Sequence, residues 1–323
     1  MEATRRGLLA GALAAAAAVP ALAAPAEDGL TIERFPLWSG PPPGKTARPV
    51  EDVVVMRSPD GPADNIAWTH VATPMLTAVK PARPNGAAVL VVPGGGYSRV
   101  AIGRNGSELA RAFAARGCTA FDLLYRLPHD QWTAGPDVSL QDAQRAIRVI
   151  RAGAGSRWQV DPARVAVTGF SAGGHVAARA ASQAGVQTYA PTDAIDRQSP
   201  RPTVAGLFFP VITMMDEGVH ARSRSELLGD RLHDPAAQRR WSAQLDLPAD
   251  MPPSFVACNA DDPVVPPENS LLMFQALRQA KIPTELMIFE HGGHGPPADH
   301  KNGTPVPWLD LFLAFAGDHG LAG

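Results

Sequence analysis

The sequence predicts an α/β fold with a mostly parallel central sheet and helices on both of its faces. Strand-like apolar runs alternate with helical segments along most of the chain. Some runs, such as residues 87–92, are continuously apolar, as expected for strands that are covered on both sides. The 323 residues, 45% of them hydrophobic, are enough to bury one large core.

The predicted elements follow one another with short connections. The first strand is expected at residues 50–56 and the second at 69–79, where Pro74 interrupts it. Further strands are predicted at residues 87–92, 119–125, 164–168, 204–211, 254–258 and 285–289. Helices are predicted at residues 105–116, 138–151, 171–184, 270–280 and 308–316. Asp142 and Arg145, three residues apart on one helix, are expected to form a pair on its surface.

Residues 1–24 have the pattern of an export signal. Arg5 and Arg6 precede a run of small apolar residues, and Ala21-Leu22-Ala23 is typical of a signal-peptidase site. The paired arginines favour the twin-arginine route, with an ordinary Sec signal as the alternative. The run is too short and too rich in Ala for an anchor. We therefore expect a periplasmic or secreted protein with no stable membrane insertion after export.

The remaining chain predicts one domain at residues 50–320, after an extended lead-in at 25–49 that is rich in Pro and Gly. Residues 212–250 show no clear period and many charges, which indicates an insertion at the carboxyl edge of the sheet, near the active site. Cys118 and Cys258 belong to separate apolar runs, which favours two free buried thiols. A net charge of −2 without a basic run argues against a nucleic-acid partner.

The pentapeptide Gly169-Phe170-Ser171-Ala172-Gly173 joins a predicted strand to a predicted helix. This is G-x-S-x-G in the context of a nucleophile elbow, a tight turn that lifts a serine hydroxyl above the sheet. The same pattern also occurs by chance in turns, but the strand and helix around it favour Ser171 as a nucleophile.

The segment Pro93-Gly94-Gly95-Gly96-Tyr97 follows the strand at residues 87–92. Glycines here allow backbone N–H groups to approach a substrate oxygen, as in an oxyanion loop. The expected donors are Gly95 or Gly96 together with Ala172. A plain glycine-rich turn is the alternative; neither phosphate-binding pattern is present.

Two adjacent carboxylates, Asp261 and Asp262, follow the strand at residues 254–258. A carboxylate at a strand end can accept the N–H of a catalytic imidazole. We expect Asp262 in this role because it begins the D-x-x-V-P pattern of such hydrolases, with Asp261 in reserve.

The segment His291-Gly292-Gly293-His294-Gly295 follows the last predicted strand. His294 is expected to be the general base, and the chain order Ser, Asp, His is the one that this kind of hydrolase requires. His291 is expected to support it. A metal site of His291, His294 and His300 is an alternative without a recognised spacing, so no metal and no cofactor are expected. His175, one turn beyond Ser171, is expected to order the elbow through hydrogen bonds.

Taken together, these motifs resemble the bacterial bifunctional feruloyl and acetyl-xylan esterase-like family of α/β-hydrolases. The matching stretches span about residues 70–315 and read AAVLVVPGGGY, YRLP, VDPARV, GFSAGGHVAA, FFPVITM, LLGD, ADDPVVPPENS and FEHGGHG. The resemblance implies one α/β-hydrolase domain that deacetylates plant cell-wall polysaccharide or cleaves related sugar esters without a cofactor. It assigns the triad to Ser171, Asp262 and His294. Residues 295–297 and 103–106 depart from the family pattern and leave the acyl pocket open.

Other functions remain compatible with these motifs. A general small-molecule or lipid esterase, a serine peptidase and an inactive binding protein of the same fold are the alternatives, and the expected partner is an acylated sugar or a small ester. Aromatic side chains that could stack on a sugar are Tyr97, Trp132 and Trp241.

Overall fold

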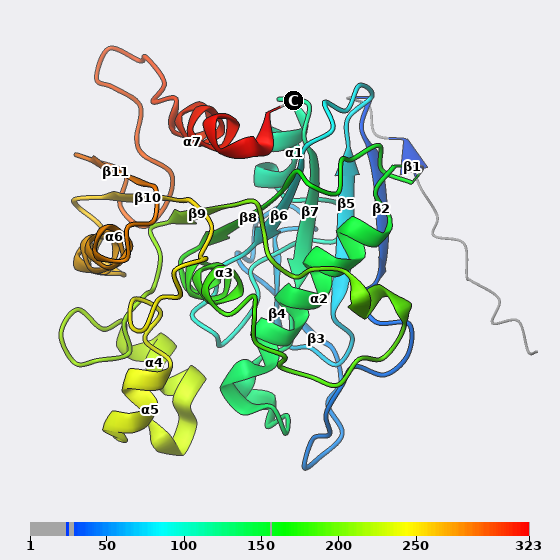
Figure 1. Ribbon diagram of the computed structural model, residues 1–323, viewed down its shortest axis with the longest axis vertical. Coiled ribbons are helices and arrows are strands. Elements are labelled where there is room, and N and C mark those ends of the chain that lie inside the picture. The colour runs from blue at the N-terminus through cyan, green and yellow to red at the C-terminus, as the bar shows by residue number, and fades with distance from the viewer. Residues whose placement is uncertain (1–23, 26–28, 156, 323) are drawn as a thin grey trace, which may run out of the picture.

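The computed structural model describes residues 24–25, 29–155 and 157–322 (Figure 1). Its central sheet consists of β1 (Ala24–Pro25), β2 (Thr31–Pro36), β5 (Met75–Lys80), β6 (Ala88–Val92), β7 (Thr119–Leu124), β8 (Val165–Phe170), β9 (Val204–Phe208), β10 (Ser254–Asn259) and β11 (Thr284–Phe289). Their order across the sheet is β1-β2-β5-β7-β6-β8-β9-β10-β11. The strands from β7 to β11 in this order run parallel, and β1, β2 and β5 pair antiparallel. The predicted mostly parallel sheet is confirmed.

Helices cover both faces of this sheet, as predicted. These helices are α1 (Glu108–Ala114), α2 (Val138–Ala152), α3 (Ala172–Ser182), α6 (Glu268–Gln279) and α7 (Trp308–Ala316). Two further helices, α4 (Ala221–Leu228) and α5 (Pro235–Arg240), lie apart from the faces of the sheet (Figure 1). In β6, Leu90 packs into the cluster that contains α2, α3 and α6 side chains. Val89 and Val91 point to the other face, where Phe113 of α1 and Phe312 of α7 pack. The alternation along each strand thus fills two separate core layers.

The first predicted strands differ from the structure. β3 (Val53–Met56) and β4 (Ile66–His70) form a separate two-stranded antiparallel sheet. The strand predicted at residues 69–79 is divided at Pro74, because its beginning belongs to β4 and its end to β5. A proline has no N–H for a sheet ladder, so the chain changes partners there.

The segment expected as a lead-in, residues 25–49, contributes to the sheet. β2 pairs with β5 along its whole length, from Thr31 opposite Lys80 to Pro36 opposite Met75. The next residues, Leu37 and Trp38, are buried in the main core cluster. The folded sheet therefore begins before residue 50.

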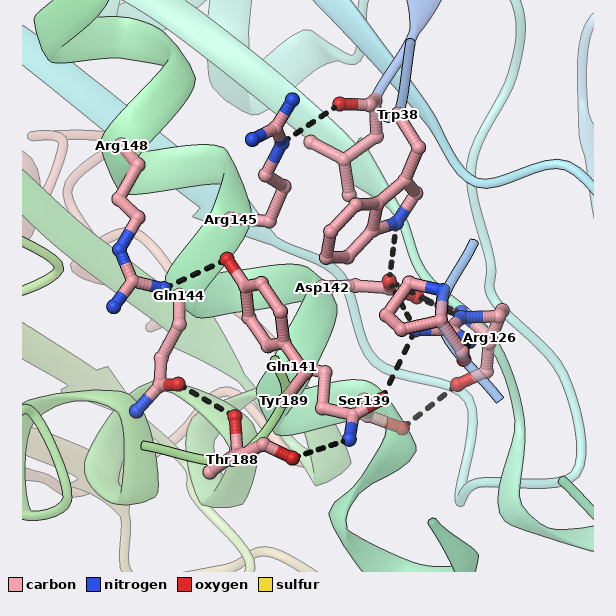
Figure 2. Close-up of polar contacts among 12 residues, drawn as sticks. Trp38, Arg126, Ser139, Gln141, Asp142, Gln144, Arg145, Arg148, Thr188 and Tyr189 are labelled. Atoms are coloured by element: carbon pink, nitrogen blue, oxygen red, sulfur yellow. Dashed lines mark hydrogen bonds and ion pairs between the residues drawn. The ribbon is translucent and has the colours of Figure 1, made fainter. Parts of the chain in front are cut away.

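The prediction of a surface pair between Asp142 and Arg145 on α2 is wrong, because both side chains are buried (Figure 2). The carboxylate of Asp142 accepts hydrogen bonds from Nε and Nη2 of Arg126 and from the indole N–H of Trp38. Neither side chain of the Arg126–Asp142 pair is exposed to solvent. The partner of Asp142 thus lies sixteen residues away in the YRLP segment, beyond the reach of a helix-spacing argument.

Arg145 binds a different segment. Its guanidinium donates to Asp193 at 2.6 Å and 2.7 Å and to Asp196 at 2.9 Å, and its Nε donates to the carbonyl of Leu37 at 3.3 Å. Paired charges of this kind can be buried because each guanidinium nitrogen of Arg145 finds an acceptor. Together the two arginines attach the segment around Trp38 and the loop before β9 to α2.

The remaining predictions on chain features have mixed outcomes. Cys118 and Cys258 are free and buried, as predicted. Within the described ranges, no helix combines the length and apolarity needed to cross a bilayer. The signal predicted at residues 1–24 lies, apart from Ala24, outside the described residues.

Candidate active site

Four loops meet at the carboxyl ends of β6, β8, β10 and β11, and they bring the three predicted catalytic side chains together. His294 Nε2 lies 2.8 Å from Ser171 Oγ, and His294 Nδ1 lies 2.8 Å from Asp262 Oδ2. The side chain of His294 is one-fifth exposed, whereas that of Asp262 is almost completely buried. An imidazole that bridges a hydroxyl and a buried carboxylate can accept the hydroxyl proton and be stabilised when it becomes charged.

Ser171 adopts a backbone conformation that is unusual for a residue with a side chain. Its φ is 57° and its ψ is −124°, between the end of β8 and the start of α3. The amide of Ser171 donates to the carbonyl of Phe208, and its own carbonyl accepts from the amide of Val211. These two hydrogen bonds, to the last residue of β9 and to the loop that follows it, stabilise the strained turn. Backbone strain of this kind is found at functional sites.

Glycines flank this turn because no side chain fits there. A Cβ on Gly169 would lie 2.2 Å from the carbonyl oxygen of Gly173, and one on Gly173 would lie 2.2 Å from the carbonyl oxygen of Val92. A Cβ on Gly94 would lie 2.8 Å from Cβ of Ser171. The elbow and the glycine loop are therefore in direct backbone contact across the site.

The two adjacent aspartates have different partners. Oδ1 of Asp262 accepts from the amides of Val264 and Val265, which leaves Oδ2 for the imidazole of His294. Asp261, the reserve candidate, is exposed, and its carboxylate accepts from the amides of Gly293 and Gly292. The hydrogen bond from Gly293 is the main cause that lowers the pKa of Asp261. Asp261 thus holds the backbone of the histidine loop, while Asp262 orients the ring.

The predicted oxyanion donors come from the glycine loop and from the start of α3. Gly95 and Gly96 line the same cavity as Ser171, with φ values of 142° and 65°. Ala172 is the first residue of α3, and the first N–H groups of a helix have no acceptor within it. The arrangement can present amides to a negative oxygen, and the α3 dipole adds to the effect.

Tyr97 and His175 connect the glycine loop to α3. The Tyr97 hydroxyl lies 2.7 Å from His175 Nδ1, and His175 Nε2 lies 2.6 Å from the carbonyl oxygen of Trp241. Because a carbonyl only accepts, Nε2 carries the proton and the Tyr97 hydroxyl donates to Nδ1. Burial lowers the pKa of His175 to about 3 and raises the pKa of Tyr97. The neutral imidazole therefore orders the elbow region through hydrogen bonds, as the sequence predicts.

The predicted sugar-stacking side chains do not form a platform. Tyr97 and Trp241 are only 1% and 3% exposed, because their rings pack in the core. Trp132 is absent from the described wall of the Ser171 cavity. The Tyr97 hydroxyl and the Trp241 indole N–H both have hydrogen-bond partners inside the protein, so these side chains can be buried.

The segment at residues 212–250 supplies two side chains of this site that the sequence does not single out. His220 and Arg222, at the start of α4, line a cavity of about 430 Å³ together with Ser171 and His294. Burial is the main cause that lowers the pKa of His220, and nearby His294 contributes. Phe209 also lines the cavity, with its ring centroid 5.1 Å from that of His294. The segment has no clear period, and the LLGD stretch within it does not point to His220 or Arg222. The sequence indicates only that the segment lies near the active site.

The metal alternative at the histidine loop is not formed in the described residues. His291 pairs with Asp261 and Glu290, at 3.4 Å and 3.1 Å. The group of described side chains with ligand atoms close enough for a metal is instead His70, His129 and Asp130, which borders a different cavity.

Comparisons with known proteins agree with this geometry. The family model described as BD-FAE matches residues 78–277. An acetylxylan esterase of Xylanibacter ruminicola is 31% identical over 218 residues, which cover 67% of this chain and 42% of that protein. Endo-1,4-beta-xylanase B of Butyrivibrio fibrisolvens is 36% identical over 214 residues, covering 64% of this chain and 32% of that protein. The chain thus spans less than half the length of these curated relatives.

Solved structures match over more of the chain. The acetyl ester-xyloside bifunctional hydrolase of Caldicellulosiruptor lactoaceticus is 29% identical, with a TM-score of 0.68, and the match covers 90% of this chain and 97% of that one. The esterase Est2 of Thermogutta terrifontis is 26% identical, with a TM-score of 0.60, and the match covers 78% of this chain and 89% of that one.

Proposed function

Because the chain belongs to the BD-FAE family of α/β-hydrolases, we propose that it hydrolyses carboxylic esters, with acetyl groups on xylan or related plant cell-wall saccharides as its substrates. The observation that carries the proposal is the continuous hydrogen-bonded series Ser171–His294–Asp262. It lies beside a glycine loop and a helix N-terminus that can stabilise an oxyanion.

The reaction proceeds through an acyl-enzyme. His294 Nε2 takes the proton of Ser171 as Oγ attacks the ester carbonyl, and Asp262 stabilises the imidazolium. The amides of Gly95 or Gly96 and of Ala172 bind the oxyanion of the tetrahedral intermediate. The intermediate collapses as His294 gives its proton to the departing sugar oxygen, which leaves as a hydroxyl. Water, deprotonated by the same imidazole, then attacks the acyl carbonyl, and the acid leaves as Ser171 Oγ regains its proton.

The choice of an acetylated saccharide rests on the relatives. Acetylxylan esterase, a xylanase and an acetyl ester-xyloside hydrolase are among them. A general carboxylesterase is the alternative, and Est2 of Thermogutta terrifontis, with structures that contain butyrate and propionate, represents it.

Two measurements test the proposal. Per unit enzyme, acetate release from acetylated xylan should exceed ferulate release from matched feruloyl esters. Aryl acetates should be cleaved as well. Ser171→Ala should reduce kcat on an aryl acetate by about 10⁴-fold or more. Ser199→Ala, at an exposed serine outside the cavity wall, is the matched control. Undiminished turnover in Ser171→Ala, or failure of a fluorophosphonate to label the wild type, would contradict the mechanism. Hydrolysis of aryl esters without acetylated xylan would favour the general esterase.

We further propose that the protein is exported. Arg5-Arg6 before the Ala-rich run supports the twin-arginine route. Replacement of both arginines by lysine should retain the full-length precursor in the cytoplasm, which fractionation measures. Normal export of that variant would indicate the Sec route, and retention of the wild type in the cytoplasm would contradict export.

A further inference from the structure

The wall of the cavity around Ser171 is basic. Arg57, Arg99 and Arg222 line it, whereas no Asp or Glu occurs among the described residues of this wall. Asp262, the nearest carboxylate of the triad, is buried behind His294 and already accepts three hydrogen bonds. The whole chain carries a net charge of −2, so the positive wall is a local feature.

The three arginines come from three separate parts of the chain. Arg57 follows β3, Arg99 belongs to the turn after the glycine loop, and Arg222 lies in α4. Their side chains are exposed, whereas Ser171 is only 8% exposed. The positive charge thus surrounds the mouth of the cavity, and the nucleophile lies deeper.

Arg222 is fixed at this mouth with part of its guanidinium free. Its Nε donates to Ser98 Oγ at 3.1 Å, and Ser98 Oγ in turn donates to the carbonyl of Gly95 at 3.1 Å. In the described part of the chain, its Nη atoms have no acceptor. The guanidinium groups of Arg57 and Arg99 likewise have no acceptor among described residues. Donors in this planar arrangement match the two oxygens of a carboxylate.

We propose that the arginines at the cavity mouth bind a carboxylate of the substrate, so that the preferred substrate is an acetylated xylo-oligosaccharide that carries a uronic acid. This inference rests on the proposed ester hydrolysis. The leaving sugar, rather than the acyl group, bears the carboxylate, because the arginines lie at the exposed mouth while the acyl carbonyl must reach buried Ser171 and the glycine loop. A neutral polysaccharide would leave these guanidinium groups without a counter-charge, although water can solvate them.

The test compares kcat/KM for two acetylated xylo-oligosaccharides of equal length, one with a glucuronic acid branch and one without. We expect a preference for the acidic substrate of about 10-fold at low salt, which weakens toward unity at about 0.5 M NaCl because the exposed charges are screened. Arg222→Gln should reduce the ratio of the two kcat/KM values by about 5-fold, mainly through KM. Arg83→Gln, at an exposed arginine outside the described cavity wall, is the matched control.

A second pair of substrates, 4-nitrophenyl acetate and 4-nitrophenyl hydrogen succinate, locates the carboxylate. A preference for the succinate ester that Arg222→Gln abolishes would support carboxylate binding but assign it to the acyl group. Equal kcat/KM values within both pairs, unaffected by Arg222→Gln and Arg99→Gln, would overturn the inference while the esterase function stands. If neither oligosaccharide is cleaved but the aryl esters are, the saccharide function fails, and the aryl pair still decides on the carboxylate.

Discussion

The hydrogen bonds of His175 predict a specific dependence of stability on pH. In the folded state both ring nitrogens have partners, and protonation of Nδ1 would break the bond that Tyr97 donates. Burial lowers the pKa of His175 from 6.5 to about 3. A folded-state pKa below the unfolded value contributes stability that is present above pH 6.5 and is lost as the pH falls toward 3.

The magnitude follows from the two pKa values. At pH 5 the unfolded chain gains about 2 kcal/mol by binding a proton at this imidazole, whereas the folded protein leaves it neutral. At pH 7.5 the same contribution is close to zero. The free energy of unfolding should therefore fall by about 2 kcal/mol through His175 alone between pH 7.5 and pH 5.

The assay is urea unfolding at pH 7.5 and pH 5 of the wild type and of His175→Gln, whose amide can donate and accept but does not titrate. The wild type should lose about 2 kcal/mol more than His175→Gln, and His233→Gln, at an exposed histidine, serves as the matched control. An equal loss in the wild type and in His175→Gln would refute the reasoning. So would an NMR titration of the wild type in which the His175 ring becomes protonated near pH 6, and this measurement does not require the variant to fold.

Three further predictions concern carboxylates. Asp262→Asn should reduce kcat on an aryl acetate by about 10⁴-fold, because the imidazole loses its buried carboxylate partner. Asp261→Asn should reduce kcat only roughly 10-fold, by loosening the histidine loop. Equal losses of kcat in steady-state assays would contradict these separate roles. Arg126→Met should lower the free energy of unfolding, measured by chemical denaturation, by about 3–5 kcal/mol, because Asp142 is left buried without its cation. A change below about 1 kcal/mol would show that other groups stabilise the buried charge of Asp142. Burial raises the pKa of Asp122 to about 6, so its contribution to stability is complete below about pH 4 and is lost as the pH rises through 6. The stability of the wild type relative to Asp122→Asn should thus decrease by about 2 kcal/mol between pH 4 and pH 7, and a constant difference in the free energy of unfolding would contradict this.

The sequence predicts the parts of the site that depend on local backbone geometry. The elbow around Ser171 requires glycines at fixed positions, and the loop of His294 follows a strand whose apolar run is easy to recognise. Asp261 and Asp262 are chemically alike and adjacent, and only the D-x-x-V-P pattern favours Asp262. In the structure the carboxylate of Asp262 faces the imidazole, and that of Asp261 faces the backbone of the histidine loop.

Contacts between distant segments could not be predicted in this way. Asp142 and Arg145 have the spacing of a surface pair, but their partners lie in the YRLP segment and near Asp193. The grouping of Arg57, Arg99 and Arg222 depends on how the β3–β4 sheet and α4 pack beside the glycine loop. No local pattern encodes such an arrangement, because each arginine alone resembles any solvated surface residue.

The early strand β2 has a consequence for the handling of this protein. The segment matched by the family model begins at residue 78, so a shortened form designed on that boundary would lack β2, Trp38 and the first half of β5. The part of β7 that pairs with Met75, Leu76 and Thr77 would then be an unpaired backbone edge, and such an edge is a template for strand exchange between molecules and for aggregation. β2 and the first half of β5, which precede the segment matched by the family model, therefore protect this edge of the sheet from such pairing.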